Sequence, residues 1–252
     1  MTGVVVRPRT MRKTPRRLKD YLGFQRTYAY PNRQRLPVFS WNTDLLIAVP
    51  QAHHVRDAPA EFSTLRRLYA ADKWKQRLWL HENGFPTPLQ VEDANVYVRR
   101  PKRHHSGIGF QCIDSESPIP LQELIAYNNV ADTYLSPLFR RTQEYRIVLH
   151  KGQVVFTILK RNDADLDQTQ AWNGANGSYF VTVRNPDNNR LRHTDCAERL
   201  INNPVLASAH LLGVDILYNS ADNTYCIVEV NFAPSMTIES NLEEFKNHVE
   251  AR

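Results

Sequence analysis

The sequence predicts a fold that combines helices with antiparallel β-hairpins, and three segments indicate this. Residues 72–84 form one helix whose start and end are both marked. Residues 144–160 hold two apolar-rich runs joined by His150-Lys151-Gly152, which is the pattern of a hairpin. Residues 213–231 hold a second pair of such runs, closed by the polar residues 220–224. Because a hairpin joins neighbouring strands directly, we expect the sheets that contain these segments to be antiparallel.

The composition places the chain among folded proteins with a substantial core. It has 252 residues, of which 42% are hydrophobic, enough for one or two domains. Its three cysteines lie far apart without Cys-x-x-Cys spacing, which argues against a thiolate zinc site and against a disulfide framework. No stretch approaches the roughly 18 apolar residues of a membrane span, and no apolar segment follows the N-terminal arginines as in a secretory signal. We therefore expect a cytoplasmic protein in a reducing compartment, with no membrane partner.

Basic residues are concentrated in the first part of the chain. The net charge is +6, and residues 1–36 hold ten basic side chains against the single acid Asp20. The rest of the chain is therefore mildly acidic. A basic arm of this kind can bind nucleic acid, an acidic protein surface or a phosphorylated ligand. A solvated arm without such a partner is an equal alternative, because no interleaved aromatic pattern accompanies the charges.

The helix over residues 72–84 has recognisable signals at both ends. Asp72 can cap its first turn, and Gly84 can adopt the left-handed conformation that ends a helix. Pro86 and Pro88 then prevent the helix from continuing. These signals fix the helix between the two ends.

A strand is expected over residues 95–99, and it leads into a basic loop over residues 100–110. Gly107 and Gly109 in this loop allow the backbone to approach an anion closely. Most glycine pairs of this spacing belong to ordinary turns. The loop therefore indicates a phosphate site only in combination with other features.

Two carboxylates and one amide are expected to converge on the second hairpin. Glu229 and Asn231 project from the same side of one strand, because strand side chains alternate between faces. If Asn219 pairs with Tyr225, Asp215 lies directly opposite Glu229, with the two Cβ atoms about 4.5–5.5 Å apart. Two carboxylates this close are costly unless a cation neutralises them, and oxygen ligands of this kind select Mg²⁺ or Mn²⁺.

The hairpin alone leaves a second interpretation open. Glu229 can pair with an arginine such as Arg146 or Arg161, while Asp215 merely ends its strand. Under this interpretation the carboxylates form ion pairs and bind no metal ion. The pattern of the hairpin favours the two interpretations equally.

The ordered set of motifs resembles the ATP-grasp superfamily, and the similarity covers about residues 67–240. The most specific part is the Glu-x-Asn-x-x-Pro motif of residues 229–234. In particular, the chain resembles short ATP-grasp proteins of bacteriophages, and more distantly the glutamate-ligating and D-alanine:D-alanine ligases. The motifs that carry the resemblance are, in order, Asp72-Lys73, Gly84-Phe85-Pro86-Thr87-Pro88, Arg100-Pro101 with its glycine loop, Glu144-Tyr145-Arg146-Ile147-Val148, Asp215, and Glu229-Val230-Asn231-Phe232-Ala233-Pro234.

The resemblance implies an α+β fold, the ATP-grasp fold, in which two α+β subdomains grip ATP between antiparallel sheets. Residues 67–139 would form the first subdomain, and residues 140–252 would form the second with the metal site. Residues 1–66 would form the basic arm and an abbreviated α/β region that precedes the ATP-grasp part. A phage-encoded chain of this kind would work in the cytoplasm of the host.

The activity that the resemblance implies is that of an ATP-dependent carboxylate–amine ligase. ATP would phosphorylate a substrate carboxylate, and an amine would attack the acyl-phosphate to give an amide, ADP and phosphate. The substrates would be an amino acid, a peptide or a protein terminus. Two alternatives are a kinase on the same fold, with a hydroxyl as acceptor, and a nucleotide-sensing or nucleic-acid-binding module led by the basic arm.

The resemblance also implies a role for individual residues. Residues 134–138 match the linker that receives adenine, mainly through its backbone groups. Arg100 stands where the family usually has a lysine, and an arginine keeps the charge and suits phosphate. Gly213 stands where D-alanine ligases have an arginine, so another residue would stabilise the acyl-phosphate. The implied metal ligands are Asp215, Glu229 and Asn231; the implied ATP-binding residues are Lys73, Arg100, Lys102, Ser106, Gly107, Gly109, Tyr134, Leu135, Ser136, Glu144 and Lys160; and the implied catalytic residues are Arg146, Lys160, Arg161 and Arg184.

Overall fold

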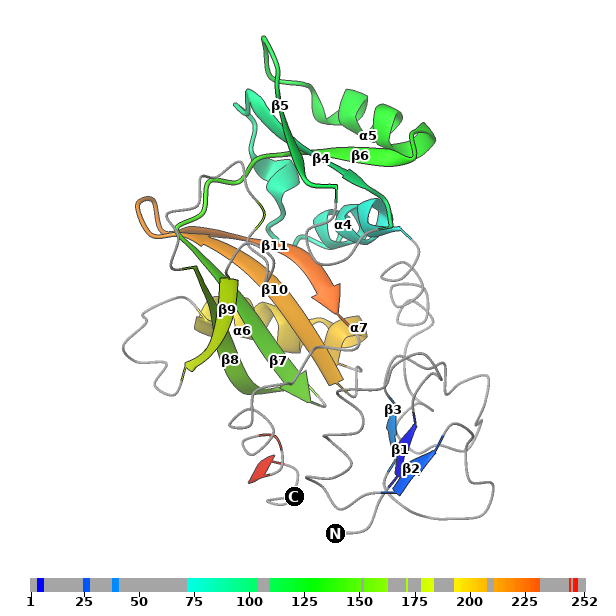
Figure 1. The fold of residues 1–252 in the computed structure, drawn as a ribbon, viewed down its shortest axis with the longest axis vertical. Coiled ribbons are helices and arrows are strands. Elements are labelled where there is room, and N and C mark those ends of the chain that lie inside the picture. Colours follow the sequence, from blue (N-terminus) through cyan, green and yellow to red (C-terminus); the bar gives the residue numbers. More distant parts are fainter. Residues whose placement is uncertain are drawn as a thin grey trace.

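The described residues form three β-sheets with helices between and against them (Figure 1). The computed structural model describes residues 72–103, 109–150, 152–162, 178–183, 193–207 and 211–231, together with residues 4–6, 25–27, 38–40, 171, 245, 247 and 248. The first sheet is parallel, with strand order β2-β1-β3. Its strands are β1 (Val4–Val6), β2 (Gln25–Thr27) and β3 (Val38–Ser40).

The second sheet is antiparallel and has the order β5-β4-β6. Residues 134–138 were expected to form a linker, but most of them belong to β6, which pairs with β4 along its length. The elements of this part are α4 (Lys73–Glu82), the short 3₁₀ helix η1 (Pro88–Gln90), β4 (Val96–Pro101), β5 (Gln111–Asp114), α5 (Leu121–Val130) and β6 (Thr133–Pro137).

The third sheet has five antiparallel strands in the order β11-β10-β7-β8-β9. Both predicted hairpins are confirmed: β7 with β8, and β10 with β11. The elements of this part are β7 (Gln143–His150), β8 (Gln153–Asn162), β9 (Ser178–Val183), α6 (His193–Asn202), α7 (Pro204–Ala207), β10 (Leu211–Asn219) and β11 (Thr224–Asn231).

The five-stranded sheet has an apolar face and a polar face. Tyr145, Ile147 and Leu149 alternate along β7 and are buried in a core that also includes residues of α6 and α7. The intervening residues of β7 project to the other side, because strand side chains alternate. Register then fixes which residues of the neighbouring strands share that side. We call it the polar face; it carries Glu144, Arg146, Lys160, Asp215 and Glu229.

Helix α4 begins and ends where the sequence predicts. The side chain of Asp72 accepts a hydrogen bond from the Lys75 backbone N–H at 3.1 Å, and Gly84 has a φ of +74°. The helix contacts both neighbouring sheets. Trp74, which is 0% exposed, stacks on Tyr134 of β6 with ring centroids 6.4 Å apart, while Leu80 joins the core of the five-stranded sheet. This double packing places α4 between β6 and β11, as Figure 1 shows.

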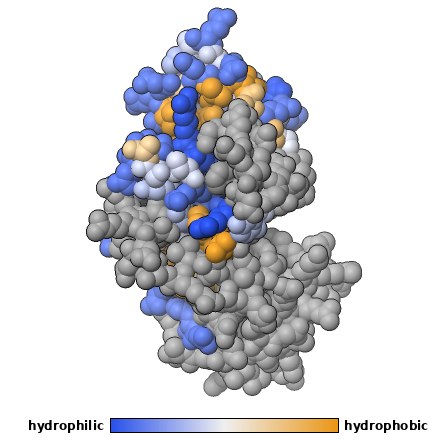
Figure 2. Space-filling view, turned by 60° about the vertical axis from the view of Figure 1, so that its left-hand side comes forward, coloured by the Kyte–Doolittle hydropathy of each residue, from blue (hydrophilic) through white to orange (hydrophobic). Residues whose placement is uncertain are grey.

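The described surface is mostly hydrophilic on the face that Figure 2 shows, with hydrophobic side chains gathered near its top. That end of the molecule carries the three-stranded antiparallel sheet and α5 in Figure 1. Within the described residues, no helix is long and apolar enough to cross a membrane. The predicted domain boundaries after residues 66 and 139 stay predictions.

Candidate functional site

Asp215 and Glu229 lie directly opposite each other on β10 and β11, as the sequence predicted. The assumed pairing that led to this prediction is wrong, because Asn219 pairs with Thr224 rather than with Tyr225. The register shifts by one residue between Asp215 and Ile216, and this β-bulge corrects the difference. The two carboxylates therefore share the polar face.

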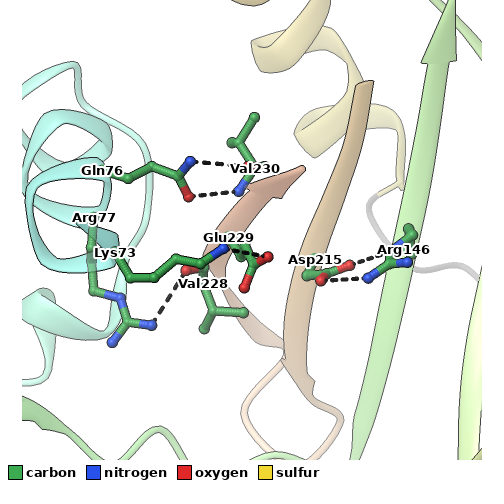
Figure 3. A network of polar contacts seen from close by, with 8 residues as sticks. All are labelled: Lys73, Gln76, Arg77, Arg146, Asp215, Val228, Glu229 and Val230. Atoms are coloured by element: carbon green, nitrogen blue, oxygen red, sulfur yellow. Dashed lines mark hydrogen bonds and ion pairs between the residues drawn. The ribbon is translucent and has the colours of Figure 1, made fainter. Parts of the chain in front are cut away.

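Each carboxylate of this pair has a cationic partner. Arg146 donates to Asp215 through two nitrogens, with Nε–Oδ1 at 2.6 Å and Nη2–Oδ2 at 2.8 Å. The Lys73 Nζ lies 2.7 Å from Glu229 Oε1. Asp215 lies between Glu229 and Arg146, so the guanidinium does not separate the two carboxylates (Figure 3). The alternative pairing of Glu229 with Arg146 is thus wrong, although an arginine does bind the other carboxylate.

Charges around Asp215 favour its ionised form. Burial alone raises the pKa of this carboxyl, but the attraction and hydrogen bonds of Arg146 outweigh it, and Lys160 and Lys73 act in the same direction. The pKa of Asp215 therefore lies below its ordinary value. Burial lowers the pKa of Lys73, which Glu229 and Asp215 oppose. An anionic Asp215 beside Glu229 provides the charge that a divalent cation requires.

A second ionic group lies beside the first on the polar face. Glu144 accepts a hydrogen bond from Lys160, with Oε2–Nζ at 2.5 Å, and forms an ion pair with Arg141, with Oε1–Nε at 2.8 Å. Glu144 and Arg146 are two residues apart on β7, so both groups occupy the same side of the sheet. The structure therefore brings together four residues that the sequence singled out: Glu144, Arg146, Lys160 and Asp215.

Arg100 at the end of β4 and Lys102 just after it lie near the start of α4. The Lys73 backbone N–H donates to the Lys102 carbonyl at 2.9 Å, which ties the helix to the end of the strand. Burial lowers the pKa of Arg100, and Tyr134 and Glu229 oppose this. Among the described residues, the buried Nε of Arg100 has no hydrogen-bond partner. A partly buried guanidinium with an unused donor, close to Glu229, is suited to bind an anion such as phosphate.

Gly109 fits closely against the end of β4. It has a φ of +70°, and a Cβ at this position would lie 2.6 Å from the Cδ of Pro101. Ser106 and Gly107, the other predicted residues of this loop, lie outside the described residues. Only glycine combines this backbone conformation with such a close approach.

Gly109→Ala is expected to lower the free energy of unfolding by about 1–3 kcal/mol, because the alanine meets backbone strain and a clash together. Gly84→Ala is the matched control, since Gly84 has a φ of +74° but a Cβ there would meet no atom within 4 Å. Urea denaturation of both variants measures the difference. Equal losses in the two variants would show that the contact with Pro101 contributes nothing.

The predicted adenine-binding residues of β6 have partners within the chain. Asn128 of α5 donates to the Leu135 carbonyl at 2.8 Å and accepts from the Leu135 N–H at 2.7 Å. Both backbone groups of Leu135 therefore have a partner within the chain. The Tyr134 side chain is buried between Trp74 and Arg77, whose guanidinium carbon lies 5.2 Å from the tyrosine ring centroid. Contacts of Tyr134, Leu135 and Ser136 with adenine stay predictions.

Three predicted residues remain, and they lie in different surroundings. Arg161 lies next to Lys160 on β8 and so projects to the opposite side of the sheet, where it is exposed. Its predicted catalytic role gains no support from this position and stays a prediction. Arg184 lies outside the described residues. Asn231 follows Glu229 on the same side of β11, opposite Gly213 and largely buried.

Sequence reasoning missed several buried polar residues that position the site. Gln76 and Arg77 of α4 contact the backbone of β11, and Arg141 contacts Glu144. A signal for the first two was present, because Lys73, Gln76, Arg77 and Leu80 follow the spacing of a single helix face. Polar residues that share a face with a core leucine indicate a specific buried contact.

The oxygen donors fit a hard divalent cation. Asp215 and Glu229 face each other, and Asn231 supplies an amide on the same side of β11. Carboxylate and amide oxygens are the ligands that Mg²⁺ and Mn²⁺ prefer. Among the described residues there is no cluster of three or more His, Cys, Asp or Glu side chains.

Comparison with known proteins identifies the fold. No family model and no curated protein sequence matches the chain. Several solved structures do, at low sequence identity. The ATP-grasp ligase PsnB, complexed with a phosphomimetic variant of its minimal precursor, Mg and ADP, is 14% identical with a TM-score of 0.55, over 98% of this chain and 97% of that chain.

Two further structures match over almost their whole lengths. The D-cycloserine synthetase DcsG is 14% identical with a TM-score of 0.54, over 100% of this chain and 99% of that chain. The D-alanine–D-alanine ligase from Bacillus anthracis is 14% identical with a TM-score of 0.52, over 99% of this chain and 92% of that chain. The α+β fold that the sequence motifs predicted is therefore confirmed, and this chain has the ATP-grasp fold.

Proposed function

We propose that the chain is an ATP-dependent carboxylate–amine ligase. The observation that carries the proposal is the direct pairing of Asp215 with Glu229 on the polar face, next to the partly buried cations Lys73 and Arg100. The fold adds support, since solved structures with the same fold include ligases whose complexes contain ATP, or ADP and Mg. We expect ATP to occupy the polar face of the five-stranded sheet.

In this proposal, Asp215, Glu229 and Asn231 hold Mg²⁺ or Mn²⁺. The ion would neutralise the triphosphate of ATP. Lys73 and Arg100 bind phosphate oxygens, because both are partly buried cations at the junction of α4 and β4. Catalysis then rests on positioning and charge neutralisation rather than on a covalent enzyme intermediate.

Two steps complete the proposed reaction. A substrate carboxylate oxygen attacks the γ-phosphorus of ATP, which gives an acyl-phosphate and releases ADP. An amine then attacks the carbonyl carbon, and phosphate leaves as the amide bond forms. The amine loses a proton in this second step.

Arg146 is our candidate for stabilising the acyl-phosphate. The arginine of D-alanine ligases is replaced here by Gly213, which pairs with Val148, two residues from Arg146 on β7. Arg146 therefore lies one strand away from the substituted position. Lys160 lies further along the same face and is assigned to the phosphates.

The proposal predicts formation of ADP by the full chain with ATP, Mg²⁺ and mixtures of amino acids or peptides. Asp215→Ala is expected to abolish this activity, whereas Asp93→Asn is expected to retain it because Asp93 is exposed and away from the polar face. A coupled assay for ADP measures both. Identical rates for the wild type and Asp215→Ala would exclude the proposed site.

Hydroxylamine distinguishes the ligase from the kinase alternative. An acyl-phosphate reacts with hydroxylamine to give a hydroxamate, and a phosphorylated hydroxyl does not. Formation of hydroxamate together with ADP supports the ligase. Formation of ADP and a stable phosphate ester would favour a kinase on this fold.

A further inference from the structure

Strand β11 is an edge of the five-stranded sheet, and helix α4 satisfies the backbone of that edge. An edge strand has outward N–H and C=O groups that need partners. The Gln76 side chain, only 1% exposed, provides two of them at Val230: its Oε1 accepts from the Val230 N–H at 3.0 Å, and its Nε2 donates to the Val230 carbonyl at 3.0 Å. One carboxamide thus takes the place of a neighbouring strand, as Figure 3 shows.

Two more contacts from the same segment hold the edge. Arg77 donates through Nη2 to the Val228 carbonyl at 3.3 Å, and the Ile227 N–H donates to the Pro86 carbonyl at 2.7 Å. Val228 is the additional residue of the β-bulge, because Ile227 pairs with Ile216 and Glu229 pairs with Asp215. Residues 76–86 therefore contact the backbone on both sides of the bulge.

The bulge decides which face Glu229 occupies. If the register at the turn, where Asn219 pairs with Thr224, continued without a shift, Glu229 would lie opposite Val214. Val214 is fully buried in the core on the apolar face, and directly paired residues share a face. The additional residue moves Glu229 onto the polar face, opposite Asp215.

We propose that Gln76 and Arg77 are positioning residues that hold this bulge and so place Glu229 beside Asp215. The part of this inference that concerns cation binding rests on the proposed function. Helix α4 performs two tasks, since its Lys73 pairs with the Glu229 side chain while its next turn fixes the backbone on either side of that residue. The positions of the carboxylate and of its cationic partner are thus set by a single helix.

Gln76→Met tests the inference, because methionine has a similar length but cannot bond to Val230. We expect Mn²⁺ to bind about ten- to a hundredfold more weakly to this variant in the presence of a non-hydrolysable ATP analogue, which is the usual loss when support for a metal ligand is removed. Free Mn²⁺ is measured by electron paramagnetic resonance. Affinity for the analogue in EDTA is expected to remain unchanged, because Gln76 contacts β11 and not the phosphate-binding cations.

Gln122→Met is the matched control, since Gln122 is an exposed residue of α5. It is expected to bind Mn²⁺ and the analogue like the wild type. Gln76→Glu keeps the acceptor for the Val230 N–H and is expected to lose less Mn²⁺ affinity than Gln76→Met. If Gln76→Met does not fold, the Mn²⁺ affinity of Gln76→Glu tests the inference instead.

Two results would overturn the inference: wild-type Mn²⁺ affinity in folded Gln76 variants, or an equal loss of Mn²⁺ and analogue binding, which indicates general destabilisation. Absence of Mn²⁺ binding in the wild type would instead reject the proposed cation site. In that case, NMR contacts between the backbones of Asp215 and Glu229 decide the inference. Their loss in Gln76→Met supports the positioning role, and their retention rejects it.

Discussion

Asp215→Asn and Glu229→Gln are each expected to slow ADP formation by about three orders of magnitude, and the double variant is expected to be no slower. Removal of one group that stabilises charge in the transition state typically slows the reaction by about 10²–10³, or about 2.7–4 kcal/mol in the barrier. Residues that act on one cation are not additive, because the first substitution already removes most of the shared function. The rates of the four proteins at saturating ATP form the test.

The control for this comparison of four proteins is that each variant is folded. Asp215→Asn leaves Arg146 without its anionic partner, so circular dichroism and urea denaturation must show that the variant is folded. If the two losses multiply in the double variant, the carboxylates act independently. That result would contradict their joint action on one cation.

Trp74→Ala is expected to lower the free energy of unfolding by about 3–5 kcal/mol, the usual range for removal of a fully buried tryptophan. Trp74 is 0% exposed and stacks on Tyr134, and its Nε1 donates to Asn129 Oδ1 at 3.2 Å. The truncation leaves a cavity between α4 and β6. Urea denaturation followed by fluorescence measures the loss.

Trp79→Ala is the comparison for this variant, because Trp79 is only partly buried and lies on the same helix. We expect a smaller loss there. Trp74→Phe keeps a ring against Tyr134 and is expected to restore much of the stability. Similar losses for Trp74→Ala and Trp79→Ala would contradict the assignment of Trp74 as the contact that joins α4 to β6.

Local sequence signals predicted the helix and both hairpins correctly. Asp72 and Gly84 mark the ends of α4 because capping and the left-handed conformation depend on only a few neighbouring residues. The hairpin around Gly152 is equally local, and its glycine has a φ of +71°. The fold was recognisable because these local elements occur in an order that resembles a known superfamily.

The register near the pair of Asp215 and Glu229 could not be derived locally. Pairing Asn219 with Tyr225 leads to the correct partners Asp215 and Glu229, but this starting pair is wrong. Asn219 pairs with Thr224, and the β-bulge then shifts the register by one residue. That bulge is held by Gln76 and Arg77, which lie about 150 positions earlier in the chain. A hairpin pattern contains no information about such a partner.

The surroundings of two candidate residues differ in how far they could be predicted. The side of the sheet that Arg161 occupies could be derived from the sequence, because alternation along β8 places it on the face opposite to Lys160. The engagement of Leu135 by Asn128 could not, because a helix side chain that completes an edge strand leaves no periodic signal. Both cases show that the face and the outward backbone of a strand must be known before roles are assigned.

The position of a bound cation tests the central claim most directly. Crystals of the full chain grown with Mn²⁺ and a non-hydrolysable ATP analogue would show the ion in an anomalous difference map. We predict one peak in contact with oxygens of both Asp215 and Glu229, with phosphate oxygens of the analogue on its other side. An analogue bound elsewhere, or one on the polar face with no ion shared by the two carboxylates, would contradict the claim.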